Sequence, residues 1–395
     1  MRILWFSVTP SLFHPRTNGH NGGGWIASLE RIVRQIPEIK LGIAFNFDDH
    51  GFVYEQNGVS YYPISHGGFE TYKRIIDDYK PDLIQIFGSE NDFGMICGNT
   101  TVPVVIHMQG CLPPYHNALF PVGMSPLDFI TQKGLNWQNR YMGLRSEPAF
   151  RRNAEKEIKT IQRCKYFMGR TDWDHRLINL FNPSATYFHC EEALRQSFLD
   201  GQELWAGDDS GLKRIVSIIS RPWYKGCDLI LKTANLLTQY TDIDFEWQVY
   251  GIPEMRFYEH KYGINAEKVH IKVMGTVSEA ELAKALCLSS CYVHPSYIDN
   301  SPNSICEAQI LGVPVLATHV GGISSLVKDG ESGILFPAND PYTLASLIKQ
   351  LSFDRKLAEK LSNGARQQAL LRHDPERISQ TLIKIYKQII HESNP

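Results

Sequence analysis

The chain has 395 residues, of which 43% are hydrophobic and 21% are charged, and its formal net charge is −2. At roughly 150 residues per domain this length predicts two or three domains, and the composition excludes a disordered or fibrous protein. We expect no nucleic-acid partner, because a chain of this charge has no overall basic field to attract a polyanion.

The eight cysteines are scattered along the chain and form no C-x-x-C pair. This distribution is typical of a reducing compartment and argues against a disulfide framework or a structural zinc site. No apolar run approaches the ~18 residues that cross a bilayer, and the first residues lack the apolar stretch of a signal peptide. We expect a cytoplasmic protein that is soluble or peripherally attached to a membrane.

Short β-branched or aromatic runs alternate with helical stretches through the first half of the chain. The pattern predicts strands at 2–7, 41–47, 82–87, 102–107 and 166–168, and helices at 26–35, 70–79 and 147–164. A polar stretch without periodicity follows at 200–211 and is typical of a linker.

The same alternation restarts after this linker. It predicts strands at 214–220, 245–250, 269–273, 291–294 and 315–317, and helices at 228–237, 279–288 and 304–311. The tail, about 354–390, has a helical pattern that Pro375 breaks and that Asp374 is placed to cap.

Two alternating series separated by a linker predict an α/β protein with two facing Rossmann-like domains. Parallel sheets of this kind need helices on both faces, which the alternation supplies. We expect the first domain at 1–205 together with the C-terminal helix 375–395, which would cross back to it. The second domain is expected at 206–374.

A glycine-rich loop before the first predicted helix ends in Gly22, Gly23 and Gly24. Consecutive glycines let backbone N–H groups turn toward a ligand, and the helix N-terminus adds partial positive charge. The loop predicts an anion site for a diphosphate, although it matches neither G-x-G-x-x-G nor a Walker loop. A surface loop without a ligand is one alternative, and an NAD-type site using Asp48 and Asp49 is another.

Two cations, Arg221 and Lys225, follow the first strand of the second predicted domain. They lie at the carboxyl end of a strand, where open α/β sheets bind their ligands. A guanidinium and an ammonium group both suit phosphate oxygens. Solvated surface cations would give the same pattern.

The most specific motif follows the predicted strand 291–294 and carries two acids eight positions apart, Asp299 and Glu307. We predict that a helix begins near Ser304, so that its free N–H groups serve a phosphate and Glu307 lies in its first turn. The two carboxylates can each chelate vicinal hydroxyls of a sugar. An acid that only complements the helix dipole is the alternative for Glu307.

These motifs resemble those of the family 4 retaining glycosyltransferases, which have the GT-B fold. The matching residues are Pro295-Ser296, Asp299 where the family usually has Glu, Glu307-Ala308, Gly312-x-Pro314-Val315, Gly321-Gly322, Asp329-Gly330-x-x-Gly333, Val273-Met274-Gly275, and Arg221 with Lys225-Gly226. The resemblance is specific over about 215–340. It is looser before residue 200, where Gly22–Gly24 and His107 match.

The resemblance implies a UDP- or GDP-sugar as donor, a glycan or lipid-linked acceptor, and no metal or further cofactor. Glu307 would hold the nucleotide ribose, and Gly275 would lie at the base. Asp299 would hold the donor sugar with help from the residues that follow it, which are Ser301, Pro302, Asn303 and Ser304.

The same resemblance assigns the leaving group and the acceptor side. Arg221 and Lys225 would neutralise the departing diphosphate, and the loop Gly22–Gly24 would close on it. His107 would lie beside the donor sugar and the acceptor, with a structural histidine at a strand end as the alternative. Fixed cations and N–H donors suit this reaction, because negative charge accumulates on the leaving phosphate in the transition state.

A basic segment runs from Lys133 to Arg170, with ten Lys or Arg against three acids. It follows the aromatic and proline-rich stretch 112–129. Such a segment suits anionic headgroups or a pyrophosphate-linked glycan, so we expect peripheral membrane contact there. A solvated helix face is the alternative.

Three other functions are compatible with parts of the sequence. A metal-dependent glycosyltransferase would use Asp172 and Asp174 as a D-x-D motif, but Thr171 or Asp172 is better placed as a helix cap. A sugar-nucleotide epimerase and a non-catalytic nucleotide-sugar-binding module can share the two-domain fold. The acid pair and the cations favour a transferase over both.

Overall fold

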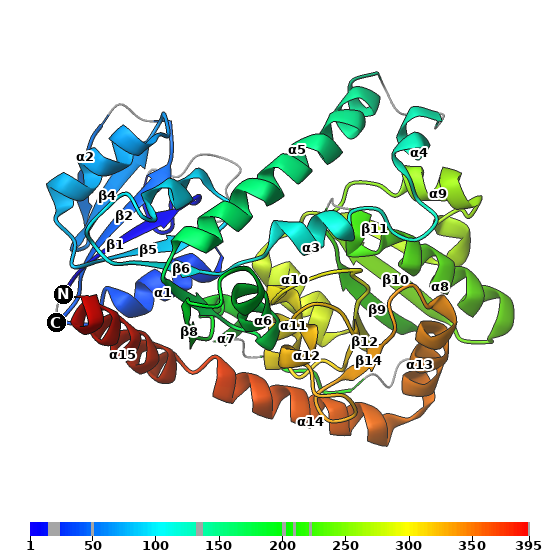
Figure 1. The fold of residues 1–395 in the computed structure, drawn as a ribbon. Coiled ribbons are helices and arrows are strands. Elements are labelled where there is room, and N and C mark those ends of the chain that lie inside the picture. The colour runs from blue at the N-terminus through cyan, green and yellow to red at the C-terminus, as the bar shows by residue number, and fades with distance from the viewer. Residues whose placement is uncertain are drawn as a thin grey trace. The chain divides into compact units, whose positions relative to one another are not determined.

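The computed structural model describes residues 1–14, 24–48, 51–131, 137–199, 203–207, 211–220 and 223–393, with side chains described outside 129–146. The chain divides into two compact units. Unit 1 contains Met1–Pro113, Arg152–Gln196 and Arg372–Pro395, and unit 2 contains Pro114–Arg151 and Ser197–Leu371. Figure 1 colours the chain from its N-terminus in blue to its C-terminus in red.

In its described residues, unit 1 has an eight-stranded sheet in the order β3-β4-β2-β1-β5-β6-β7-β8. The strands are β1 (Arg2–Ser7), β2 (Lys40–Asn46), β3 (Tyr54–Gln56), β4 (Val59–Ile64), β5 (Leu83–Phe87), β6 (Val104–His107), β7 (Tyr166–Gly169) and β8 (Thr186–His189). Neighbours pair in parallel except β3, which runs antiparallel to β4. The helices of this unit are α1 (Trp25–Val33), α2 (Phe69–Tyr79), η1 (Asp92–Ile96), α6 (Asp172–Phe181) and α15 (Pro375–Ser393). The helices α5 (Trp137–Arg163) and α7 (Gln196–Leu199) cross the boundary between the units: α5 belongs to unit 1 from Arg152 on, and α7 belongs to it only at Gln196.

The sheet of unit 1 is buried on both faces, as its first strand illustrates. Ile3 and Trp5 pack in one apolar cluster, whereas Leu4 and Phe6 pack in another. Successive strand residues point to opposite faces, so this separation means that helices cover both sides. The result confirms the Rossmann-like architecture predicted from the alternating pattern.

The C-terminal helix α15 belongs to unit 1, which confirms the predicted return of the chain (Figure 1). Its buried residues Leu382 and Tyr386 join the same cluster as Trp5. The Trp5 indole donates a hydrogen bond to the Tyr386 hydroxyl at 3.1 Å, and that hydroxyl donates to Gln85 Oε1. The helix therefore completes the core of this unit.

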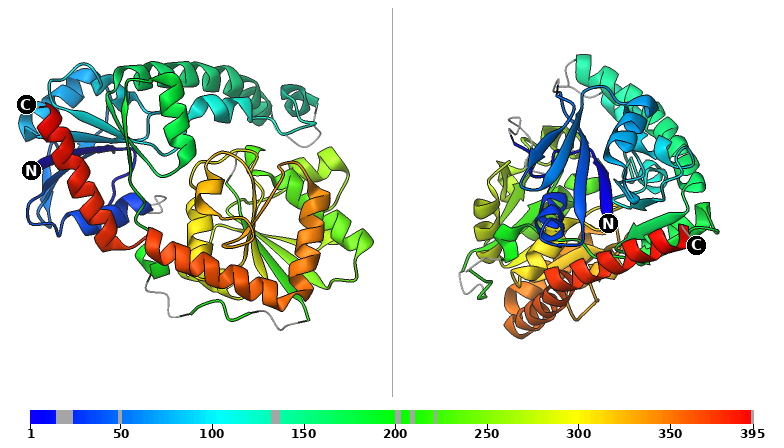
Figure 2. Two further views of the ribbon diagram at one scale, coloured as in Figure 1. Left: turned by 60° about the horizontal axis from the view of Figure 1, so that its bottom comes forward. Right: turned by 90° about the vertical axis from the view of Figure 1, so that its left-hand side faces the viewer.

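Among its described residues, unit 2 has a six-stranded parallel sheet in the order β11-β10-β9-β12-β13-β14. The strands are β9 (Lys213–Ile218), β10 (Phe245–Tyr250), β11 (Ile271–Gly275), β12 (Cys291–His294), β13 (Val315–Thr318) and β14 (Ile334–Phe336). The helices are α3 (Leu112–Asn117), α4 (Pro126–Thr131), η2 (Trp223–Lys225), α8 (Cys227–Tyr240), α9 (Arg256–Tyr262), η3 (Glu267–Val269), α10 (Glu279–Cys287), α11 (Asn303–Ile310), α12 (Ile323–Leu326), α13 (Pro341–Phe353) and α14 (Arg355–Arg372). Figure 2 shows α13 (orange) on one side of this sheet and α11 (yellow) on the other.

The division into units differs from the predicted domains at two boundaries, 197–205 and 372–374, and in one longer segment. Pro114–Arg151 groups with unit 2, although the sequence pattern assigned it to the first domain. Phe120 stacks on Trp223 with ring centroids 5.3 Å apart, and Met124 is buried in the core of unit 2. Asp128 also forms an ion pair with Lys261 of α9. Hydrophobic periodicity does not reveal such contacts between distant parts of the chain.

The helix α5 is tied to unit 1 through a buried carboxylate, Glu157, which is 1% exposed. Its Oε1 accepts a hydrogen bond from the Ser89 hydroxyl, and its Oε2 accepts one from the Leu112 N–H at 2.6 Å. Burial raises the pKa of Glu157 from 4.5 to about 7, and the neighbouring Glu90 adds to the rise. The two hydrogen bonds offset part of this effect.

The free energy of unfolding should fall as the pH rises from 4.5, the usual pKa of a glutamate, to about 7, the raised pKa of Glu157 in the folded protein. Within this interval, the folded protein holds a proton on Glu157 that the unfolded chain releases, and the full difference is worth roughly 3 kcal/mol. Glu157→Gln removes the titrating group and should flatten this pH dependence. Urea denaturation of both proteins at about pH 5 and about pH 8 measures the free energy of unfolding at each pH. If this free energy changes equally with pH in the unaltered protein and in Glu157→Gln, Glu157 is not the cause.

Candidate active site

The candidate site lies at the carboxyl edge of the sheet in unit 2. Strand β9 lies between β10 and β12, so the chain leaves β9 toward one side of the sheet and later continues on the other. Open α/β sheets bind ligands where the strand order reverses in this way. Lys225 follows β9, and Asp299 follows β12, so both lie at this position.

Asp299 is the centre of a buried cluster of polar side chains. Its Oδ2 accepts a hydrogen bond from Lys225 Nζ at 2.6 Å and lies 3.0 Å from His294 Nε2. Burial alone would raise the pKa of Asp299, but the Lys225 charge and the His294 hydrogen bond outweigh it and hold the pKa well below its usual range. Asp299 is thus ionised at neutral pH although it is only 6% exposed.

His294 connects this cluster to the helix α11. Burial lowers the pKa of His294, so the imidazole is neutral and its Nε2–H can donate to Asp299. The Tyr292 hydroxyl lies 3.1 Å from His294 Nδ1 and 2.7 Å from Ser304 Oγ. A chain of hydrogen bonds therefore runs from the carboxylate to the first turn of α11.

Two glycines let the backbone pack tightly around the Asp299 loop. A Cβ at Gly226 would lie 2.1 Å from the Pro295 carbonyl oxygen, and one at Gly321 would lie 1.9 Å from that of Asp299. Gly226 has φ +82° and Gly321 has φ +52°, a region that disfavours other residues. The Gly322 N–H donates to the Asp299 carbonyl oxygen at 2.9 Å. The loop is held on both sides.

The helix α11 begins at Asn303, with Pro302 as its N-cap and no side-chain cap among the described residues. Glu307 is its fifth residue, so the prediction that it lies in the first turn was wrong. The helix begins one residue earlier than expected, because Pro302 takes the extended cap position and Asn303 follows it into the helix. Glu307 is 2% exposed, and its burial is not explained by the helix dipole.

The segment Leu112–Asn117 adds aromatic contacts that the sequence pattern did not reveal. The Asn300 N–H donates to the Tyr115 hydroxyl at 3.1 Å, and the Tyr115 ring stacks on Tyr224 with centroids 5.3 Å apart and planes 3° apart. Tyr224 precedes Lys225, and the Tyr297 N–H donates to its carbonyl oxygen at 2.6 Å. The aromatic stretch that precedes the basic segment thus packs, in part, beside the Asp299 loop.

The other predicted site residues are distributed as follows. Ser301 is buried next to Asp299, and Gly275 ends β11 with φ +68° and open space around its Cβ position. Gly24 precedes α1 in unit 1. Several predicted or alternative site residues lie outside the described residues: Gly22, Gly23, Asp49 and Arg221.

His107, at the end of β6 in unit 1, is fully buried. Its ring contacts Trp25 with centroids 4.9 Å apart and stacks on Phe87 at 5.9 Å. Burial, and then the charge of Arg170, hold the pKa of His107 well below its usual range, so the imidazole is neutral. Since Trp25 is the first residue of α1, the structure brings His107 close to Gly24.

The alternative D-x-D motif is a helix cap in this structure. The Thr171 side chain accepts a hydrogen bond from the Asp174 N–H at 3.1 Å, and Asp174 Oδ2 accepts one from the Thr171 N–H at 3.3 Å. This capping box makes Thr171, one of the two predicted caps, the N-cap of the helix α6. Elsewhere in the described chain, no group of three or more His, Cys, Asp or Glu could hold a metal ion.

Comparison with known protein families matches the C-terminal part of the chain. Residues 207–368 match the family described as "Glycosyl transferases group 1". The matched region is less than half of the chain, so the comparison shows a similarity to this family. It contains Lys225, Asp299 and Glu307, so the Asp299 cluster is part of the matched region.

Curated proteins with related sequences match a part of the chain. A D-inositol 3-phosphate glycosyltransferase of Nocardioides is 33% identical over 101 residues, which are 26% of this chain. The aligned part spans 22% of that relative's length.

Solved structures match the region 207–368 together with the rest of the chain. Sucrose-phosphate synthase of Thermosynechococcus elongatus has a TM-score of 0.71 at 14% identity, with 99% of each chain covered. HepE of Anabaena, in complex with UDP and glucose, has a TM-score of 0.67 at 14% identity, covering 98% of this chain and 100% of the other. The fold is therefore GT-B. The match of residues 207–368 to group 1 glycosyltransferases supports the predicted resemblance to family 4.

No described helix is both long enough and apolar enough to cross a membrane.

Proposed function

We propose that the protein is a retaining glycosyltransferase, which moves a hexose from a nucleoside diphosphate sugar to a glycan, lipid-linked or other acceptor without a metal ion. The observation that carries this proposal is the buried Lys225–Asp299–His294 cluster at the strand-order reversal of the sheet in unit 2, within the region that matches group 1 glycosyltransferases. HepE, which shares the fold, was solved with UDP and glucose, and this supports a nucleotide-sugar donor.

The cations of the site would act on the leaving group. Negative charge grows on the departing diphosphate in an oxocarbenium-like transition state, and a fixed ammonium group stabilises it without reorganisation. Lys225 is held by Asp299 in a place where such a charge can act. Arg221 would add a second cation. The free N–H groups at the start of α11 would bind the phosphate oxygens.

The two acids would bind different parts of the donor. Glu307 would accept hydrogen bonds from the nucleotide ribose. Asp299 would hold the donor sugar together with the backbone from Ser301 to Ser304, and Gly275 would leave room for the base. In unit 1 the loop Gly22–Gly24 would close on the diphosphate.

His107 has a positioning part in this proposal. Its side chain is not exposed in the described structure, but it packs against Trp25, the first residue of α1. It would thus hold the start of that helix, and with it Gly24, on the acceptor side. The chain would work in glycan or surface polysaccharide synthesis in the cytoplasm, with the basic segment 133–170 in peripheral contact with a membrane.

The two acids should fail differently when they are replaced. Glu307→Ala should mainly weaken nucleotide binding, by about 1.5–3 kcal/mol for a charged hydrogen bond. Asp299→Glu lengthens the side chain to the usual family residue and should change the ranking of donor sugars more than the affinity for the nucleotide. Titration with nucleoside diphosphates and hydrolysis of a panel of donors measure both effects. Unchanged ranking together with unchanged nucleotide affinity would refute the assignment.

Donor turnover in EDTA tests the proposal as a whole. We expect purified protein to release nucleoside diphosphate from one UDP- or GDP-sugar at the same rate with and without EDTA, because Lys225 supplies the positive charge. The α-configured product expected of retention from an α-linked donor is read by NMR. Activity that is lost in EDTA and restored by manganese would contradict metal independence, and binding without turnover would indicate a nucleotide-sugar-binding module.

A further inference from the structure

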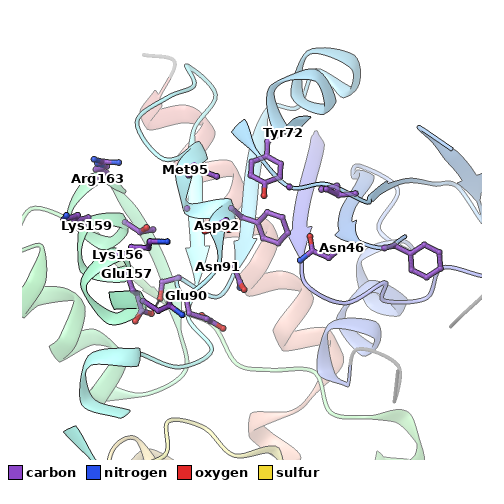
Figure 3. Close-up of a pocket in the computed structure, with 18 of the residues that line it drawn as sticks. Asn46, Tyr72, Glu90, Asn91, Asp92, Met95, Lys156, Glu157, Lys159 and Arg163 are labelled. Carbon is purple, nitrogen blue, oxygen red and sulfur yellow. Dashed lines mark hydrogen bonds between the residues drawn. The ribbon is translucent and has the colours of Figure 1, made fainter. Parts of the chain in front are cut away.

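Unit 1 contains a cavity of about 860 Å³ that the Asp299 cluster does not use. It lies at the carboxyl ends of β2, β4 and β5, and η1 and α5 contribute to its walls (Figure 3). Its volume is within the ~300–1,000 Å³ typical of small-ligand sites. Its lining side chains are mostly polar, which suits a hydrated ligand better than an apolar one.

One wall of the cavity carries a row of cations. Lys156, Lys159 and Arg163 follow each other along α5, as Figure 3 shows. Their spacing of three and four residues places them on one face of a helix, over a length of about 10 Å. None of the ion pairs between described residues involves these three side chains.

Groups that accept hydrogen bonds gather on the strand side of the cavity. Glu90, Asn91 and Asp92 follow β5, and Asn46 ends β2 (Figure 3). The Glu90 carboxylate folds back over Gly88, where a Cβ would lie 2.4 Å from Glu90 Oε2. The absence of a side chain at Gly88 therefore leaves room for this carboxylate. Carboxylate and amide groups in such positions suit the hydroxyl groups of a sugar ring.

The two sides of the cavity are held at a fixed separation by Glu157. This residue comes from α5, between the cations, and binds Ser89 of the segment after β5 and Leu112. Gly94 of η1 also approaches α5 closely, since a Cβ there would lie 2.4 Å from the Thr160 side chain. The cation row and the acceptor groups are thus parts of one built site.

We propose that this cavity binds an anionic sugar, with the hydroxyl groups on Glu90, Asn91 and Asp92 and the charged substituent on Lys159 and Arg163. This sugar is the acceptor of the glycosyl group, an assignment that rests on the proposed function. The charged substituent is a phosphate or a carboxylate, since both accept hydrogen bonds from cationic side chains. Two of the ten cations of the basic segment therefore serve a ligand in the cavity.

Binding of small probes tests this inference. Glucose 6-phosphate, glucuronate and glucose are titrated into the full chain at low salt, with binding followed by NMR. We expect at least one charged sugar to bind about tenfold or more tightly than glucose, because a charge-assisted hydrogen bond is worth about 1.5–3 kcal/mol. The preferred charged sugar distinguishes phosphate from carboxylate, and binding should weaken as salt is added.

Matched variants locate the binding. Lys159→Gln and Arg163→Gln, alone and combined, should each weaken binding of the charged sugar about tenfold and leave glucose binding unchanged. Lys73→Gln removes an exposed cation of α2 that does not line the cavity, and it should bind like the unaltered protein. Melting temperatures confirm that the variants fold.

Two outcomes overturn the inference: charged sugars that bind no better than glucose, and binding that the Lys159 and Arg163 variants leave unchanged. A parallel titration with UDP and GDP separates this failure from that of the proposed function. If a nucleotide binds and no charged sugar does, the inference fails alone. If no nucleotide binds, the proposed function fails, and a charged sugar that still binds through Lys159 and Arg163 is then a ligand but no acceptor.

Discussion

Lys225→Met should reduce glycosyl transfer by about 10²–10³-fold, the usual effect of removing one fixed charge that stabilises a transition state. The Lys225 ammonium group pairs with the buried carboxylate of Asp299. It lies at the carboxyl edge of the sheet in unit 2, where it would face the diphosphate. The loss should appear in kcat as well as in nucleotide affinity, because charge on the leaving group grows as the bond breaks. Initial rates with a UDP- or GDP-sugar measure it.

Removing Lys225 also leaves Asp299 without its main counter-charge, so stability must be separated from catalysis. The double variant Lys225→Met/Asp299→Asn removes both charges and should regain most of the stability lost in the single variant, without regaining activity. Lys349→Met, an exposed position of α13, is the control for a change of net charge and should remain fully active. An active Lys225→Met enzyme would contradict the assignment.

Gly321→Ala should displace the Asp299 loop and abolish activity. The new Cβ would lie 1.9 Å from the Asp299 carbonyl oxygen, and φ at this position is +52°. Backbone of this kind costs roughly 1–2 kcal/mol for a residue with a side chain, and the clash with the backbone adds to that. A fall in melting temperature of several degrees and a loss of activity of at least about tenfold are expected.

Gly330→Ala is the matched control for this change. Gly330 has φ +71°, but nothing lies within 4 Å of its Cβ position. Gly330→Ala should lose only the stability that the positive φ costs a residue with a side chain, and it should stay active. Equal loss of activity in both variants would show that the close approach to Asp299 is unimportant.

The sequence pattern predicted most of unit 2 because its signals are local. The bounds of β10 and β12 agree with the predicted strands residue for residue. The strand β12 begins with a short apolar run, and β10 alternates apolar and polar residues before Val249 and Tyr250. The strands β3, β4, β8 and β14 were missed. The hairpin of β3 and β4 turns at Asn57-Gly58, both with positive φ, a turn signal that was available but not used.

The site was predicted less completely because its partners come from distant parts of the chain. Asp299 and Lys225 were identified by motif, but their ion pair joins residues 74 positions apart. Tyr115 lies 185 positions from Asn300, and no periodicity indicates that contact. His294 is the last residue of β12, and its place in an apolar run is typical of a core residue, so the sequence does not indicate its contact with Asp299. The position of Glu307 changed because the helix start shifted by one residue.

The basic segment shows a related difficulty in unit 1. Its charge count predicts an anionic partner but cannot separate a membrane surface from a cavity. The spacing of Lys156, Lys159 and Arg163 places them on one face of α5, and only the packing of that face against the segment after β5 shows that it lines a cavity. Local spacing gives the face of a helix, and the fold gives its surroundings.

Titration of the purified protein and of its Lys225→Met variant with UDP and GDP tests whether Lys225 and the Asp299 cluster form a nucleotide site. We expect saturable binding of at least one of the two nucleotides, weakened about tenfold or more in the variant, because Lys225 would bind the diphosphate. Absence of binding by both nucleotides, or equal affinity in the two proteins, would contradict it.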